Sequence, residues 1–141
     1  MIPLSPEHAK QADLYVDQQH EHYQHMGQRL FETFNYDRNS GRINTQIRNL
    51  QQIVCSAPRF ADIEDFVKNQ MGRDTSSAKQ WRQVGDGILK ELQALRKRAA
   101  EYDDQELQLA FRLRLARGWV RAVVSEYLYR IALDQMEHSH V

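Results

Sequence analysis

The apolar positions of this chain recur with helical spacing, most clearly in its last third. Residues 104–136 contain no proline and a single glycine, Gly118. Apolar side chains fall on almost every side of a helix drawn through them, at Ala110, Phe111, Leu113, Leu115, Ala116, Trp119, Val120, Ala122, Val123, Val124, Tyr127 and Leu128. This pattern is typical of a helix inside a bundle. We therefore expect residues 104–136 to form the long apolar central helix, with an aspartate of Tyr102–Asp104 as its cap.

Two helices are predicted in the first part of the chain. Ser5 before Pro6 is a helix start, and apolar residues spaced alternately by three and four predict one helix over residues 6–34. Gln19 is the polar exception in that seam. The second helix opens at Asn44 or Thr45 and is closed by Pro58.

Two further helices are predicted before the long one. Residues 59–71 form the third, and Gly72 would supply the left-handed residue that commonly ends a helix. Residues 78–101 form the fourth, with Ser76 or Ser77 as its cap. The expected fold is all-α, a bundle of about five helices.

The length, charge balance and cysteine count of the chain limit the class of protein that it can be. A chain of 141 residues suits one domain, spanning 1–141 with a frayed tail at 137–141. The 19 basic and 19 acidic residues balance, so any nucleic-acid site must come from local clustering. Cys55 is the single cysteine, which excludes an intrachain disulfide and favours a small buried side chain in a reducing compartment. Without an apolar leader or membrane segment, we expect a cytoplasmic protein with no membrane partner.

The central helix carries one stripe of cations. Arg114, Arg117 and Arg121 are spaced i, i+3, i+7 and fall within about 60° of one another on the helix. Such a stripe suits the phosphates of a strand. The alternatives are a solvated edge, or ion pairs with acids of a neighbouring helix.

The fourth helix carries a second stripe. Its members are Lys79, Arg82, Asp86, Lys90, Gln93 and Lys97, which lie within about 80° of one another. Arg96, Lys97 and Arg98 add a short basic run beside it. A solvated helix face is the simpler interpretation, and the rotation of the two helices decides whether the stripes merge.

Two loop-to-helix segments add further cations. Residues 41–50 combine Arg42 and Arg48 with hydroxyl, amide and backbone donors at a helix start, a combination that suits a phosphate backbone. Lys68 and Arg73 flank another helix end. Ordinary helix capping with surface cations is the alternative for both.

Metal and catalytic chemistry find little support in the pattern. His22 and His25 share a helix face, but the paired Glu-x-x-His of di-iron bundles is missing there. No phosphate loop, nucleophile elbow or paired Cys and His is present. We therefore expect a non-enzyme without cofactor or metal.

Residues 43–50 (INTQIRNL) resemble the Thr-x-Gln-Ile/Leu-Arg helix start of small subunits of CRISPR RNA-guided effector complexes. Residues 66–73 and the arginine-rich final helix are similar to the C-terminal helical region of type I-D large subunits, which is also made as a separate small subunit. The resemblance implies a helical bundle that stacks in several copies and contacts the large and backbone subunits. It also implies that basic grooves hold guide RNA-paired target DNA, or the displaced strand, without reading sequence.

Two hypotheses follow. The first is a non-catalytic small subunit of such a complex, whose partners are the other subunits, further copies of itself, guide RNA and target DNA. Its expected phosphate contacts are Arg42, Arg48, Lys68, Arg73, Lys79, Arg82, Lys90, Arg114, Arg117 and Arg121. The second is a protein-interaction or adaptor bundle whose charged stripes contact no nucleic acid.

Overall fold

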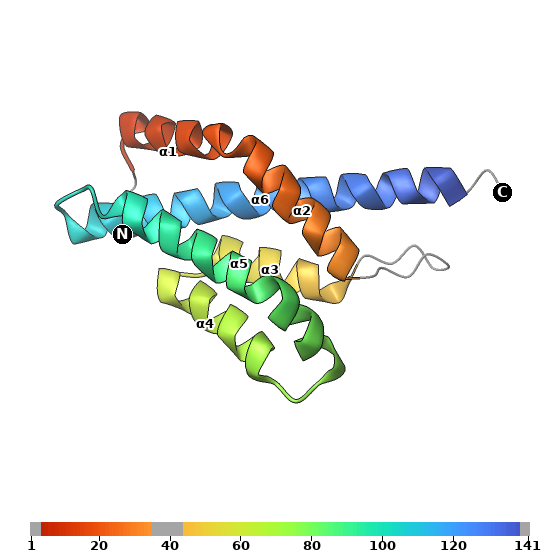
Figure 1. Ribbon diagram of the computed structural model, residues 1–141. Helices are drawn as coiled ribbons and strands as arrows, with labels where there is room; N and C mark the ends of the chain where they lie inside the picture. The colour runs from red at the N-terminus through yellow and green to blue at the C-terminus, as the bar shows by residue number, and fades with distance from the viewer. Residues whose placement is uncertain (1–3, 35–43, 139–141) are drawn as a thin grey trace.

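Six helices make up the computed structural model, which describes residues 4–34 and 44–138 (Figure 1). They are α1 (Pro6–Gln18), α2 (His20–Thr33), α3 (Thr45–Ser56), α4 (Phe60–Gly72), α5 (Ser76–Ala99) and α6 (Gln105–His138). No strand occurs in the described ranges, so the all-α class is confirmed. The count exceeds the expected five because the helix predicted for residues 6–34 is in fact two.

The break between α1 and α2 lies at Gln19, whose backbone leaves the helical conformation at φ −92° and ψ 9°. Hydrogen bonding nevertheless continues through the bend. The Gln19 amide donates to the carbonyls of Tyr15 and Val16 at 3.2 and 3.1 Å, and the Tyr23 amide donates to Gln19 at 2.9 Å. Since few backbone groups lose a partner, the bend needs neither proline nor glycine. Figure 1 shows the chain changing direction there.

α6 is the centre of the bundle. Its 34 residues span about 51 Å and contact each of the other five helices. Ten of its side chains are buried, among them Phe111, Trp119 and Tyr127. The helix was predicted to be surrounded by the bundle on almost every side. One side is instead open to solvent, where Arg114, Arg121 and Leu128 are exposed. Among the described residues, no helix has the length and apolar content required to cross a bilayer.

Two glycines let the N-terminal helices lie close to α6. A Cβ atom added to Gly27 of α2 would lie 2.5 Å from the Val123 carbonyl oxygen. One added to Gly118 of α6 would lie 2.8 Å from Cγ2 of Val16 in α1. Because these are tighter than van der Waals contacts, larger residues at either position would push α2 or α1 away from the central helix.

Side chains cap three helices, at the predicted Ser5, at one of the two predicted starts of α3, and at one of the two aspartates before α6. The Ser5 hydroxyl accepts from the His8 amide at 3.2 Å, the Asn44 side chain from the Gln46 amide at 2.8 Å, and the Asp104 carboxylate from the Glu106 amide at 3.1 Å. Each satisfies a backbone donor that has no partner inside its helix.

Three local predictions are wrong. The backbone of Gly72 is not left-handed; instead Arg82 of α5 donates to the carbonyls of Met71 and Arg73 at 2.8 and 3.2 Å and closes the end of α4. α5 begins at Ser76 with Thr75 before it, so neither serine is its cap. Cys55 is exposed rather than buried, because it lies on the outer side of α3.

Candidate nucleic-acid interface

The outer face of α5 carries a row of cations. Lys79, Arg82, Lys90 and Lys97 are all exposed, while the opposite face packs inward through Trp81, Ile88 and Leu92. The helical period puts the two sets on opposite sides. Lys79 and Lys97 are 18 residues apart, about 27 Å of helix, which corresponds to the rise of about eight base pairs.

α4 lies antiparallel beside α5 and adds two cations. Arg96 pairs with Glu64 at one end of the contact, and Arg82 bonds to the Met71 carbonyl near the other. Lys68 falls between these two points on α4 and is exposed, and Arg73 follows the last residue of α4. The α4–α5 ridge is defined here as Lys68, Arg73, Lys79, Arg82, Lys90 and Lys97.

The α4–α5 ridge is electrostatically open. None of its six cations forms an ion pair with a described residue, and Asp86 is the acid that shares its α5 row. Residues 59–99 hold nine bases and six acids, whereas residues 6–33 hold five acids and two bases. Although the net charge of the whole chain is balanced, α4 and α5 are therefore net basic and α1 and α2 are net acidic.

The basic run at residues 96–98 contributes one open cation. Arg96 is bound by Glu64 and lies 5.1 Å from the Phe60 ring centroid. Arg98 pairs with Glu101 at 2.9 Å and lies 5.2 Å from the Phe111 ring centroid. Lys97, which belongs to the predicted stripe but not to the expected contacts, is the residue of this run that faces solvent freely.

The α6 row, defined as Arg114, Arg117 and Arg121, is not uniformly open. Arg114 donates two hydrogen bonds to Asp13 of α1, Nε to Oδ1 at 3.0 Å and Nη2 to Oδ2 at 2.8 Å. These bonds hold the pKa of Asp13 below its usual value. The expectation that all three arginines are free to bind phosphate is therefore wrong at Arg114, because α1 places the Asp13 carboxylate within hydrogen-bond distance of it.

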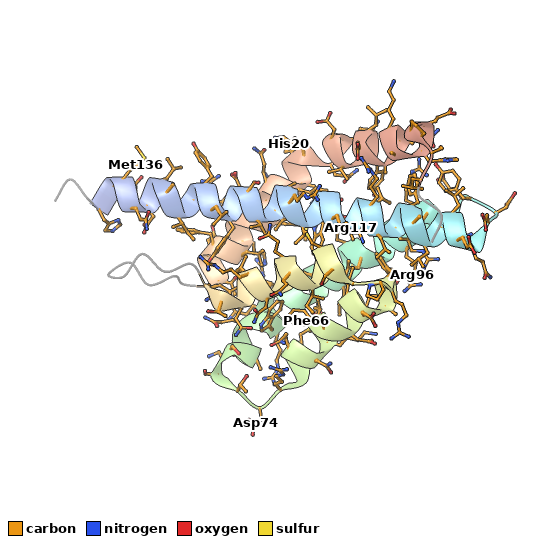
Figure 2. All side chains as sticks on the ribbon, turned by 180° about the vertical axis from the view of Figure 1, so that it is seen from behind. His20, Phe66, Asp74, Arg96, Arg117 and Met136 are labelled. Atoms are coloured by element: carbon orange, nitrogen blue, oxygen red, sulfur yellow. The ribbon has the colours of Figure 1, made fainter. Side chains whose placement is uncertain are left out.

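The other two arginines of the α6 row differ from Arg114. Arg117 is half-buried and lies on the side of α6 next to α3 (Figure 2), and its Nε has no hydrogen-bond partner among the described residues. Arg121 is exposed and forms no ion pair with a described residue. Arg48 is exposed on α3. Arg42 lies outside the described residues.

The α4–α5 ridge and the α6 row do not merge. α5 lies in front of α6 in Figure 1, and α6 lies in front when the molecule is turned by 180° in Figure 2. The helices pack through their buried faces, so their cations point to opposite sides. A single strand passing straight across the molecule would meet one set or the other.

His22, considered above as a metal ligand, contacts a buried acid instead. Its Nε2 lies 3.3 Å from Oε1 of Glu91, and the Tyr23 hydroxyl donates to Oε2 at 3.4 Å. Burial raises the pKa of Glu91, while His22 and Tyr23 oppose that shift. Within the described part of the chain, no group of three or more His, Cys, Asp or Glu is arranged to hold a metal ion.

A shallow groove of 220 Å³ separates the start of α1 from the start of α6. It is lined by Leu4, Ser5, His8, Asp104, Glu106, Leu107 and Ala110. Two carboxylates beside apolar side chains repel a phosphate, so this groove does not extend either cationic surface.

No protein-family model matches the chain, and no curated protein or solved structure matches it either.

Proposed function

We propose that this protein is a non-catalytic helical subunit that holds a nucleic-acid backbone on its α4–α5 ridge. The observation that carries the proposal is the row of six exposed cations without a carboxylate partner among the described residues. Exposed cations without a carboxylate partner, four of them along about 27 Å of α5, attract a chain of phosphates and release its counterions. The side chains follow the charge of the backbone and contact no base in a fixed geometry, so binding is independent of sequence.

We further propose that this activity belongs to an RNA-guided complex, on the ground that residues 43–50 and 66–73 resemble segments of CRISPR effector subunits. In that setting the ridge holds guide-paired target DNA or the displaced strand, and other faces bind the large and backbone subunits. With no net charge on the chain, binding by one isolated copy is weak and assembly strengthens it.

A matched pair of charge reversals tests the ridge. Lys90→Glu removes a ridge cation, and Lys10→Glu makes the same change at an exposed lysine of α1. We expect Lys90→Glu to weaken binding of a labelled 20-nucleotide single strand about tenfold more than Lys10→Glu, and to lower the salt slope by about one unit. Equal effects of the two variants would contradict the proposal. Copurification of guide RNA and larger subunits with the tagged chain tests the wider setting.

The second candidate is an adaptor bundle without nucleic-acid contact, and the Arg114–Asp13 pair favours it. That pair shows that this fold uses some surface cations to hold its own helices together. The adaptor hypothesis expects a tagged chain that copurifies with protein partners unaffected by nuclease treatment. The nucleic-acid hypothesis expects the nuclease to release them or to strip RNA from the complex.

A further inference from the structure

α1 has fewer buried residues than any of the other five helices. Ala12 is its one buried residue, and it packs mainly against α6. Behind it, the chain leaves the helical conformation at Gln19. A helix with few buried contacts opens at low free energy, and the bend gives the backbone a place to turn.

A largely exposed residue of α1, Asp13, meets the α6 row at Arg114. Asp13 binds Arg114 through both carboxylate oxygens, and the charge of Arg121 also acts on Asp13. A phosphate offers a guanidinium the same planar pair of acceptors as a carboxylate does. Asp13 therefore occupies the position on Arg114 that a phosphate would take.

The contact between Asp13 and Arg114 is open to competition. The Asp13 side chain is 61% exposed and that of Arg114 is 45% exposed. Exposed ion pairs contribute little because water screens them. A polyanion that binds Arg114 and also reaches the exposed Arg121 makes one contact more than the one that it replaces.

We propose that α1 is a displaceable cover of Arg114, and that the exposed side of α6 carrying Arg114 and Arg121 is a second surface for the phosphodiester backbone of a nucleic acid. In the closed state Asp13 neutralises Arg114. When α1 swings away about Gln19, Arg114 is freed beside the exposed Arg121 on the side of the molecule opposite the α4–α5 ridge. Arg117 stays half-buried next to α3. The nature of the ligand rests on the proposed function, whereas the movement of α1 does not.

Two charge-matched variants test the cover. Asp13→Asn removes the partner of Arg114, and Asp17→Asn removes an exposed acid of the same helix that pairs with no described cation. Against a labelled 20-nucleotide oligo(dT), Asp13→Asn should bind about three- to tenfold more tightly than Asp17→Asn, with a salt slope steeper by about one unit. Adding Arg114→Gln should abolish the difference. Equal affinities of the two variants would overturn the proposal.

An engineered crosslink tests the movement. A Cβ built on Gly118 lies 3.5 Å from the Val16 Cβ, a separation that suits a disulfide. In a Cys55→Ser, Asp13→Asn background, Val16→Cys with Gly118→Cys should lock α1 when oxidised and lose the gain in affinity, and reduction should restore it. If the oxidised form binds as tightly as the reduced form, α1 is not a cover.

Hydrogen exchange separates this inference from the proposed function. Without nucleic acid, the amides of α1 should exchange faster in Asp13→Asn than in Asp17→Asn, while those of α2 remain unchanged. If Lys90→Glu loses binding but the two α1 variants behave identically, the cover alone is overturned. If no variant binds oligo(dT), nucleic acid is rejected as the ligand of both surfaces.

Discussion

The α4–α5 ridge and the α6 row are built from the same kinds of residue at the same helical spacing, yet their cations have different surroundings. On α5, at the edge of the bundle, the cations of the ridge find no carboxylate among the described residues. On α6, which touches every other helix, Arg114 is bound by Asp13 and Arg117 is half-buried. Periodicity thus places a side chain on a face, while the position of the helix in the fold decides what it meets.

The contrast between the centre and the edge of the bundle also applies to glycines. Substitution of a central glycine should give the largest change in the free energy of unfolding. Gly27→Ala would put a methyl group against the Val123 carbonyl at the centre of the bundle. We expect it to lower the free energy of unfolding by about 2–3 kcal/mol. Gly87→Ala on the outer face of α5 meets nothing within 4 Å and should raise it by about 0.5–1 kcal/mol. Urea unfolding followed by circular dichroism measures both, and equal signs would contradict the contrast between centre and edge.

The next largest change in stability should distinguish two cations of the α4–α5 ridge, Arg82 and Lys79. Arg82 closes the end of α4 through two carbonyls, whereas Lys79 has no hydrogen-bond or ion-pair partner among the described residues. Arg82→Met should therefore cost about 1–2 kcal/mol of stability, and Lys79→Met should stay within about 0.5 kcal/mol of the parent. If thermal melts show the same loss for both, Arg82 does not act as a cap.

Glu91 offers a pH-dependent test of the interior. Burial raises its pKa above the unfolded value of 4.5, so the folded state binds the proton more tightly and stability falls as pH rises from 4.5 through the folded pKa. Glu91→Gln should remove this cost and gain about 0.5–1 kcal/mol at pH 7. The gain should shrink as the pH approaches 4.5. A gain that grows at lower pH would show that His22 outweighs burial.

The smallest effect belongs to Asp13, whose pKa moves in the opposite direction. Because Arg114 lowers that pKa below 3.8, the contribution of the pair is present at neutral pH and is lost as the pH falls below 3.8. Asp13→Asn should cost about 0.2–1 kcal/mol at pH 7, and Asp17→Asn should cost less. Denaturant titrations at pH 7 and pH 3 should show the difference between the variants shrink at the lower pH.

Most of the fold could be predicted from the sequence because the local signals agree with one another. Ser5 caps the helix that it was expected to cap, Asn44 is one of the two predicted starts of α3, and Asp104 is one of the two aspartates expected to cap α6. The bend at Gln19 was not predicted, because the spacing by threes and fours and the hydrogen bonds both continue through it. The polar residue in the apolar seam, Gln19 itself, was the one signal of it. How α4 ends could not be predicted from its own sequence either, since its last carbonyls are bound by an arginine from the next helix.

The candidate site was predictable only as faces of single helices. The exposed row of α5 follows from the helical period and is observed. The pairing of Arg114 with a residue 101 positions away depends on how α1 lies across α6, which no local pattern records. The expectation that these residues bind nucleic acid stays a prediction.

Both tryptophans are fully buried, and they lie in different parts of the interior. Trp81 packs against Phe34 and Phe66 and donates its indole N–H to Gln46 at 3.1 Å, while Trp119 lies on α6. Their fluorescence should therefore be blue-shifted in the native protein and move to the red when the interior is hydrated. This shift of the emission maximum reports global unfolding. A local rearrangement at the surface that leaves the interior dry should leave the emission maximum unchanged.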